Sequence, residues 1–155
     1  MSQDVVEVLA VQAVVARVAH YLDARRWKEL RALFADEVEA DYTALFGGEV
    51  QKQSADELVL KGWQGLLSPL DATHHLLGPI EVEVKRKTAS AECHFQAYHL
   101  ASQAKGGPDW TIAGHYVFTL HRSFGGGWKI EKLVLTPSYQ TGNRQLLSEA
   151  GGKPA

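Results

Sequence analysis

One alternating stretch decides the fold: residues 89–99, Ala89-Ser90-Ala91-Glu92-Cys93-His94-Phe95-Gln96-Ala97-Tyr98-His99. Small or apolar side chains occupy every second position, and polar side chains lie between most of them. Because successive side chains of a strand point to opposite faces of a sheet, this pattern predicts a long strand with one apolar face. His99 falls in the apolar row, whereas His94 falls in the polar row and is expected to face solvent.

Strand patterns continue on both sides of this stretch. Alternating apolar residues precede it at 80–84, and two longer runs follow it at 110–123 and 128–139. The connections at 105–109 and 125–127 are rich in glycine, as hairpin turns are. This half of the chain is therefore predicted to form an antiparallel sheet.

The N-terminal part carries helical patterns instead. Residues 5–23 place an apolar side chain at every third or fourth position, and Asp4 precedes them as a suitable N-cap. This spacing predicts a long amphipathic helix. A short second helix is predicted at 27–34, and the alternation at 38–43 predicts a strand.

A third helix is predicted after Gly47-Gly48, which interrupts the strand pattern. Ser54 and Glu57 form a capping-box pattern at its start, and Pro69 follows its end. Three helices followed by a run of strands indicate an α+β fold. The helices are expected to cover one face of a curved mixed or antiparallel sheet and to enclose a cone-shaped pocket.

Length and composition indicate one globular domain. The chain has 155 residues, of which 45% are hydrophobic and 22% are charged. The domain is expected to span residues 1–150, with a flexible tail at 151–155. A short helix near 145–147 is expected to cover the mouth of the pocket.

Charge and cysteine content exclude several partner classes. The formal net charge is −2, and no run of one sign is longer than Lys85-Arg86-Lys87, which argues against nucleic-acid or membrane-surface binding. No basic region precedes the first apolar stretch, which Glu7 and Arg17 interrupt, so neither a signal peptide nor a membrane span is expected. Cys93 has no second cysteine to pair with, which favours a reducing, cytoplasmic setting.

His75 and His99 are the chief candidates for chemistry. Imidazole takes up and releases protons near neutral pH, so two histidines that face one cavity can perform acid–base catalysis. The alternative for His99 is a core histidine bonded to a backbone carbonyl. Tyr42 adds a phenol that either bonds to a substrate oxygen or packs in the core.

Asp23 closes the first predicted helix, where its carboxylate opposes the negative end of the helix dipole. Either Arg25 or Arg26 neutralises it at the surface, or it points inward and orients an imidazole. An aspartate and two histidines can also form a facial triad for iron or zinc. Only one histidine of the adjacent pair ending in His75 can face His99, so no metal site is expected.

Several short segments, in this order and spacing, carry a family resemblance: Tyr21-Leu22-Asp23-Ala24-Arg25-Arg26-Trp27-Lys28-Glu29-Leu30, Asp41-Tyr42, Thr73-His74-His75, His99, Leu120-His121 and Gly127-Trp128-Lys129. The chain resembles the SnoaL-like branch of the nuclear transport factor 2-like superfamily, and within it most resembles scytalone dehydratase. The resemblance implies a cone-shaped barrel and a dehydratase site without a cofactor. In that site Asp23, Tyr42, His75 and His99 take the places of an aspartate, a tyrosine and two histidines.

The chain departs from the resembled family at two positions. Leu22 stands where the family carries a second tyrosine, and Thr119 where it carries an asparagine. Tyr21 is adjacent to the first of these positions, but one step along a helix turns a side chain by ~100°. Ligand contacts are expected from four side chains: Thr119, Tyr21, Trp63 and Phe95.

The resemblance implies a lyase that removes water from a small cyclic or aromatic hydroxy-ketone. The expected ligand is thus a small apolar or aromatic carbonyl compound. His75 is expected to act as the base and then as the acid for the leaving group. His99, oriented by Asp23, is expected to hold the substrate or a water, while Tyr42 polarises the carbonyl. Two alternatives stay open: a ketone isomerase that uses the same pocket, and a non-catalytic binding module or structural subunit. A cavity that reaches both histidines would favour catalysis over a structural role.

The strand predicted at 110–123 bears on assembly. Its bulky residues lie on the phase opposite to His115 and Thr119: Trp110, Ile112, Tyr116, Phe118 and Leu120. If His115 and Thr119 face the pocket, the bulky row faces outward, and an exposed row of this size is usually an interface. A homo-oligomer, either a dimer or a trimer, is therefore expected.

Overall fold

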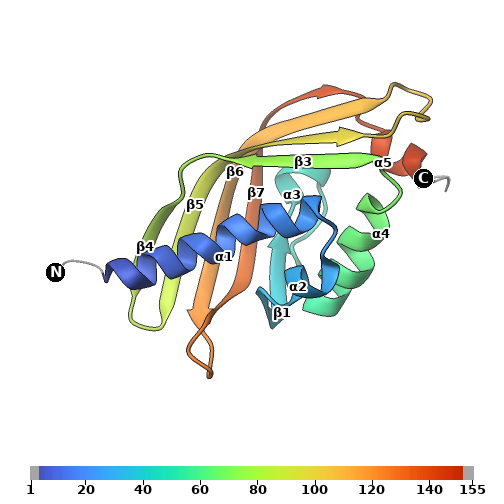
Figure 1. Cartoon of the computed structure of the whole chain (residues 1–155). Helices are drawn as coiled ribbons and strands as arrows, with labels where there is room; N and C mark the ends of the chain where they lie inside the picture. Colours follow the sequence, from blue (N-terminus) through green and yellow to red (C-terminus); the bar gives the residue numbers. More distant parts are fainter. Residues whose placement is uncertain (1–3, 152–155) are drawn as a thin grey trace.

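The computed structural model describes residues 4–151, which form helices packed on a mixed sheet (Figure 1). The helices are α1 (Val5–Asp23), α2 (Trp27–Arg31), α3 (Thr43–Phe46), the π-helix η1 (Asp56–Trp63), α4 (Gln64–Leu67) and α5 (Leu146–Ala150). The strands are β1 (Phe34–Asp41), β2 (Gln51–Ser54), β3 (Ala72–Leu77), β4 (Glu81–Lys85), β5 (Thr88–Leu100), β6 (Asp109–Arg122) and β7 (Trp128–Gly142). The first three residues and the expected tail beyond Gly151 lie outside the described part.

Within the described residues, seven strands form one curved sheet in the order β2-β1-β7-β6-β5-β3. β4 also pairs with β5, along residues 88–92, whereas β3 pairs along 95–100 of the same strand. β1 and β7 run parallel, and every other pairing is antiparallel. The predicted α+β class and the mixed sheet are confirmed. Because β2 and β3 remain as edges, the sheet is an open cone rather than a closed barrel.

Helix α1 crosses one face of the sheet (Figure 1). The Asp4 carboxylate accepts a hydrogen bond from the Val6 amide at 2.9 Å, which confirms the predicted cap. Arg25, with φ of 57°, turns the chain just beyond the end of the helix. By length and composition α1 could also cross a membrane, but Val11, Val15 and other apolar side chains of one face pack into the core.

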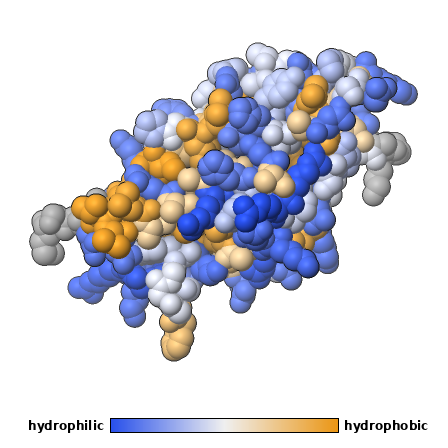
Figure 2. Space-filling view, in the orientation of Figure 1, coloured by the Kyte–Doolittle hydropathy of each residue, from blue (hydrophilic) through white to orange (hydrophobic). Residues whose placement is uncertain are grey.

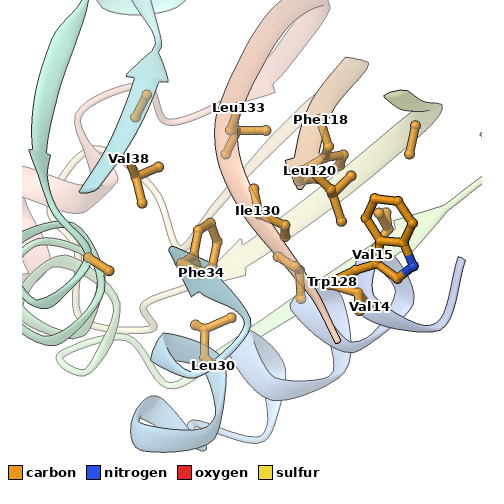
Figure 3. Close-up of a cluster of buried hydrophobic side chains, with 14 of the residues drawn as sticks. Val14, Val15, Leu30, Phe34, Val38, Phe118, Leu120, Trp128, Ile130 and Leu133 are labelled. Atoms are coloured by element: carbon orange, nitrogen blue, oxygen red, sulfur yellow. The ribbon is translucent and has the colours of Figure 1, made fainter. Parts of the chain in front are cut away.

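The core between α1, α2 and the sheet is made of large apolar side chains (Figure 3). Phe34 on β1, Phe118 and Leu120 on β6, and Ile130 on β7 are at most 1% exposed. Burial of each such side chain contributes about 1.5–3 kcal/mol. This core fixes the sheet against α1, the helix that ends at Asp23.

Two bulges in strand β7 change which alternate set of its side chains points to the inner face of the sheet. The register of β7 against β6 shifts between Ala113 and Gly114 and again between Thr119 and Leu120. As a result Trp128 and Ile130 point into the core on one phase, and Leu133 and Leu135 point inward on the other. The bulges keep the concave face apolar although the sequence changes phase.

The structure corrects several predicted boundaries before β3. The second helix ends at Arg31 rather than Phe34, because Phe34 already begins β1 as a buried strand residue. The Ser54 hydroxyl accepts from the Glu57 amide at 3.1 Å, as the capping pattern predicted. The helix that follows is wider than predicted: it is π-helical from Asp56 to Trp63. Such wider turns are often found at functional sites.

The phase predicted for the bulky row of β6 is wrong. Trp110, Ile112, Phe118 and Leu120 are all at most 5% exposed on the inner face. The expected dimer or trimer stays a prediction without that support. The most exposed apolar side chains of the helices are instead Val5 and Val6, at 68% and 70%, in the apolar patch at the N-terminal end of α1 (Figure 2).

Candidate active site

A cavity of about 450 Å³ lies on the inner face of the sheet, enclosed by helices. Its walls are mainly apolar, and neither Lys nor Arg is among its lining residues. Exposed lining residues at Phe46–Glu49 and Leu66 mark its mouth. The cavity reaches both His75 and His99, so the two histidines are not enclosed in a solid core.

His75 and Asp23 form a tightly bonded pair in the cavity wall. One carboxylate oxygen lies 2.7 Å from the His75 Nδ1, and the other accepts the His75 backbone N–H at 2.7 Å. The Thr73 hydroxyl donates to the same carboxylate at 3.0 Å. Because Asp23 ends α1 and His75 lies on the adjacent β3, this contact depends on the docking of α1 across the sheet. The bond at Nδ1 leaves the Nε2 atom of His75 for the cavity.

Asp23 is held as a carboxylate. Burial raises the pKa of its carboxyl, but hydrogen bonds from the His75 ring and backbone, the His75 charge and the Thr73 hydroxyl outweigh this and lower it. The arginines proposed as alternative partners bind elsewhere: Arg25 donates to the Ser68 and Leu70 carbonyls, and Arg26 pairs with Glu29. Asp23 therefore fixes the orientation of an imidazole, as one of the two predictions held.

The imidazole that Asp23 orients is His75, and the prediction that it orients His99 is wrong. His99 bonds through Nδ1 to the Trp110 carbonyl oxygen at 3.1 Å, and its ring stacks on the Trp110 indole at 4.6 Å between centroids. β5 and β6 pair His99 with Trp110, which explains this partner. The rings of His75 and His99 still meet edge to face, with centroids 5.8 Å apart.

His99 is a neutral imidazole at pH 7. Burial lowers its pKa to about 4, and the nearby His75 acts in the same direction. Its Nδ1–H is donated to a carbonyl oxygen, so the Nε2 atom is an acceptor. His99 can thus accept a hydrogen bond from a hydroxyl group in the cavity.

The low pKa of His99 predicts a loss of stability in acid. The pKa of His99 is 6.5 in the unfolded chain and about 4 in the folded one, so between these pH values the unfolded chain binds more protons. The contribution of His99 to stability is therefore complete above pH 6.5 and is lost as the pH falls toward 4. We expect wild type to lose about 2 to 3 kcal/mol more than His99→Gln between pH 7.5 and pH 4.5. Urea unfolding of both proteins at the two pH values measures this difference. Equal losses in the two proteins would contradict the burial of a neutral imidazole.

Tyr42 and Trp63 both line the cavity. Burial raises the pKa of the Tyr42 phenol far above its usual range, and the nearby Trp63 side chain only partly offsets this. A phenol that stays protonated can donate its hydrogen to a ligand. Tyr42 is therefore a protonated donor in the cavity.

The structure brings six of the eight predicted site residues to the cavity: Asp23 through its bond to His75, and His75, His99, Tyr42, Trp63 and Phe95 directly. It does not bring Thr119, which lies on the outward phase of β6 beside Ser90 and Lys132. Tyr21 is also outside, with its ring under the Arg26 guanidinium at 4.5 Å. The neighbouring Leu22 lines the cavity instead, as the turn of the helix requires.

The lining residues that the sequence did not identify include two aromatic side chains, Tyr116 and Trp110. Both belong to the β6 row whose phase was wrong. The pairing of His99 with Trp110 identifies them, because paired residues point to the same face of a sheet and His99 points to the inner face. Among residues 4–151 no three His, Cys, Asp or Glu side chains gather as a metal site.

Comparison with known proteins gives a family model and solved structures. The model described as a SnoaL-like domain matches residues 3–134. No curated protein matches the chain. A protein from Kribbella flavida, Kfla4162, has a TM-score of 0.80 at 21% identity, covering 90% of this chain and 95% of its own.

Two further similar structures carry names of enzymes. One from Novosphingobium aromaticivorans, named "Putative Scytalone Dehydratase", has a TM-score of 0.75 at 23% identity, covering 90% of this chain and 89% of its own. A hexachlorocyclohexane dehydrochlorinase, LinA type 2, has a TM-score of 0.74 at 18% identity, covering 90% of each chain. At these identities the likeness is one of fold.

Proposed function

Because this chain belongs to the SnoaL-like domain family, we propose that its cavity catalyses a cofactor-independent β-elimination, the loss of water from a small hydroxy-ketone. The observation that carries the proposal is the 2.7 Å bond between His75 Nδ1 and the Asp23 carboxylate at the wall of the cavity. A carboxylate in this place fixes the tautomer of the imidazole and stabilises its protonated form. His75 Nε2 is then the base.

In the proposed reaction the proton and electron pairs balance without a cofactor. His75 Nε2 takes the proton next to the substrate carbonyl, and the electron pair of that C–H bond moves toward the carbonyl oxygen. Tyr42 donates its phenol hydrogen to this oxygen as its negative charge grows. When the carbonyl re-forms, a C=C bond forms and the β C–O bond breaks. The protonated His75 gives its proton to the departing hydroxyl, which leaves as water.

His99 has a separate part in this scheme. As a neutral imidazole whose Nε2 is an acceptor, it receives a hydrogen bond from the substrate hydroxyl and places it within reach of His75. The two rings are 5.8 Å apart between centroids, which is close enough for both to contact one small molecule. His99 is thus a binding group rather than a second base.

The lining of the cavity supports a neutral, small cyclic or aromatic substrate. Its walls are mainly apolar and include neither Lys nor Arg to bind a carboxylate or phosphate. The volume of about 450 Å³ lies within the range of small-molecule sites. The names of two proteins with this fold denote loss of water and loss of hydrogen chloride, which are both eliminations.

The experiment that tests the proposal follows both steps separately. The protein is mixed in D₂O with a cyclic aromatic β-hydroxy-ketone and with the same ketone lacking the hydroxyl, and both are followed by NMR. We expect α-deuterium exchange in both compounds and formation of the enone from the first only. Exchange with migration of a double bond but no loss of water would indicate an isomerase. Neither exchange nor enone, for a ketone shown to bind, would indicate a binding module.

A further inference from the structure

Tyr116 places a second phenol in the cavity, and the scheme above does not use it. Its ring stacks on Phe95 with centroids 3.9 Å apart and planes 12° from parallel, and Phe118 packs on it at 5.6 Å. These contacts come from two neighbouring strands, β5 and β6. They hold the ring in one position at the cavity wall, as a preorganised group requires.

The Tyr116 hydroxyl has no hydrogen-bond partner among the described residues. Every buried side-chain oxygen and nitrogen within residues 4–151 does have a partner, so the unpaired Tyr116 oxygen is not fully buried. Because Tyr116 lines the cavity, its oxygen is accessible from there. The Tyr42 phenol lines the same cavity, and burial keeps it protonated. Both phenols therefore keep a hydrogen for a ligand.

Electrostatics keeps the Tyr116 phenol protonated. Burial raises its pKa well above the usual range, and the nearby Tyr42, Cys93 and Asp23 act in the same direction. Tyr42 and Tyr116 both line this one cavity. Since the lining includes neither Lys nor Arg, these hydroxyls are well suited to stabilise negative charge on an oxygen.

We propose that Tyr116 is a catalytic residue that donates its phenol hydrogen to the substrate carbonyl oxygen, forming with Tyr42 a pair of donors for the enolate. This proposal rests on the proposed function, because an enolate arises only if His75 removes the α-proton. Donors that bind the oxygen more strongly as its charge grows lower the barrier rather than only the affinity. Substrates are then limited to those whose carbonyl oxygen reaches both phenols.

The first test measures oxyanion binding without turnover. 4-Nitrophenolate is the probe, and nitrobenzene is the matched ligand without the oxyanion. Tyr116→Phe keeps the stacked ring and removes only the hydroxyl. We expect it to bind 4-nitrophenolate about 10- to 100-fold more weakly than wild type, because a hydrogen bond to a charged group is lost. Nitrobenzene affinity is expected to change less than about twofold.

Tyr139→Phe is the matched control, since its phenol lies outside the cavity, 49% exposed and bonded to Gln96 at 2.8 Å. It should bind both ligands as wild type does. Equal affinities of wild type and Tyr116→Phe for 4-nitrophenolate would overturn the proposal, and so would failure of wild type to bind it.

The second test measures turnover. With a dehydratable hydroxy-ketone, kcat of Tyr116→Phe is expected to fall about 100-fold, the effect of removing one oxyanion donor, with a smaller change in KM. Unchanged kcat would overturn the catalytic role. If wild type dehydrates no hydroxy-ketone, the proposed function fails, while the 4-nitrophenolate comparison still decides whether Tyr116 binds an oxyanion.

Discussion

His75→Ala is expected to lower turnover of a dehydratable hydroxy-ketone about 10²- to 10⁴-fold, the usual value of a positioned proton-transfer group. The substitution removes the imidazole that bonds to Asp23, so the base and the acid for the leaving group are lost together. Initial rates of enone formation measure the effect. α-Deuterium exchange, followed in the same samples, should fall by a similar factor, since both depend on proton removal.

His94→Ala is the control for this experiment. His94 lies on the neighbouring strand β5, but on its exposed outer face, and its ring meets that of His115. Its loss should leave turnover within about twofold of wild type, because His94 does not line the cavity. Asp23→Asn supplies an independent check, since it disturbs the tautomer of His75 while the ring remains. Full turnover in His75→Ala would show that the base has been misassigned.

Gly114→Ala is expected to lower the free energy of unfolding by about 3 kcal/mol or more. A Cβ at this position would lie 2.2 Å from the Thr136 carbonyl oxygen and 2.9 Å from the Pro137 Cα. Both atoms belong to the backbone of β7, so no side-chain rotation relieves the clash. The strands would have to separate at the bulge that follows Leu135, a residue of the cavity wall. Guanidinium denaturation followed by circular dichroism measures the change.

Gly125→Ala is its control. Gly125 lies in the turn between β6 and β7, where an added Cβ meets nothing within 4 Å. We expect a change within about 0.5 kcal/mol, as for most surface substitutions. A Gly114→Ala protein as stable as Gly125→Ala would mean that the close approach to β7 is not maintained in solution.

The long strands could be predicted from local pattern, because alternation states directly which side chains are buried. Residues 89–99 alternate without interruption, and every apolar member of the row is buried. β7 could not be interpreted in the same way, because its bulges change the inward phase between Ile130 and Leu133. The parallel pairing of β1 with β7 depends on how distant segments pack, which local pattern does not contain.

The candidate site shows the same division. His75, His99, Asp23 and Tyr42 could be selected from the resemblance and from their chemistry. Which histidine Asp23 holds could not, because it depends on the end of α1 lying beside β3 rather than β5. Tyr116 could not be selected because Thr119 was assumed to face the pocket, which turned the alternate residues of β6 outward. The pairing of His99 with Trp110 shows instead that Trp110 and Tyr116 share the face of His99.

The cavity and the sheet both join the first part of the chain to the last strand, and this affects how the protein folds during synthesis. Leu22 and Val18 of α1 meet Leu133 and Leu135 of β7 around one cavity, although most of the chain separates them in sequence. Contacts of such high sequence separation form slowly and late. During synthesis α1 and β1 leave the ribosome long before β7, with their apolar faces uncovered. The nascent chain is therefore expected to be a client of chaperones, and the cavity should form only after translation of β7.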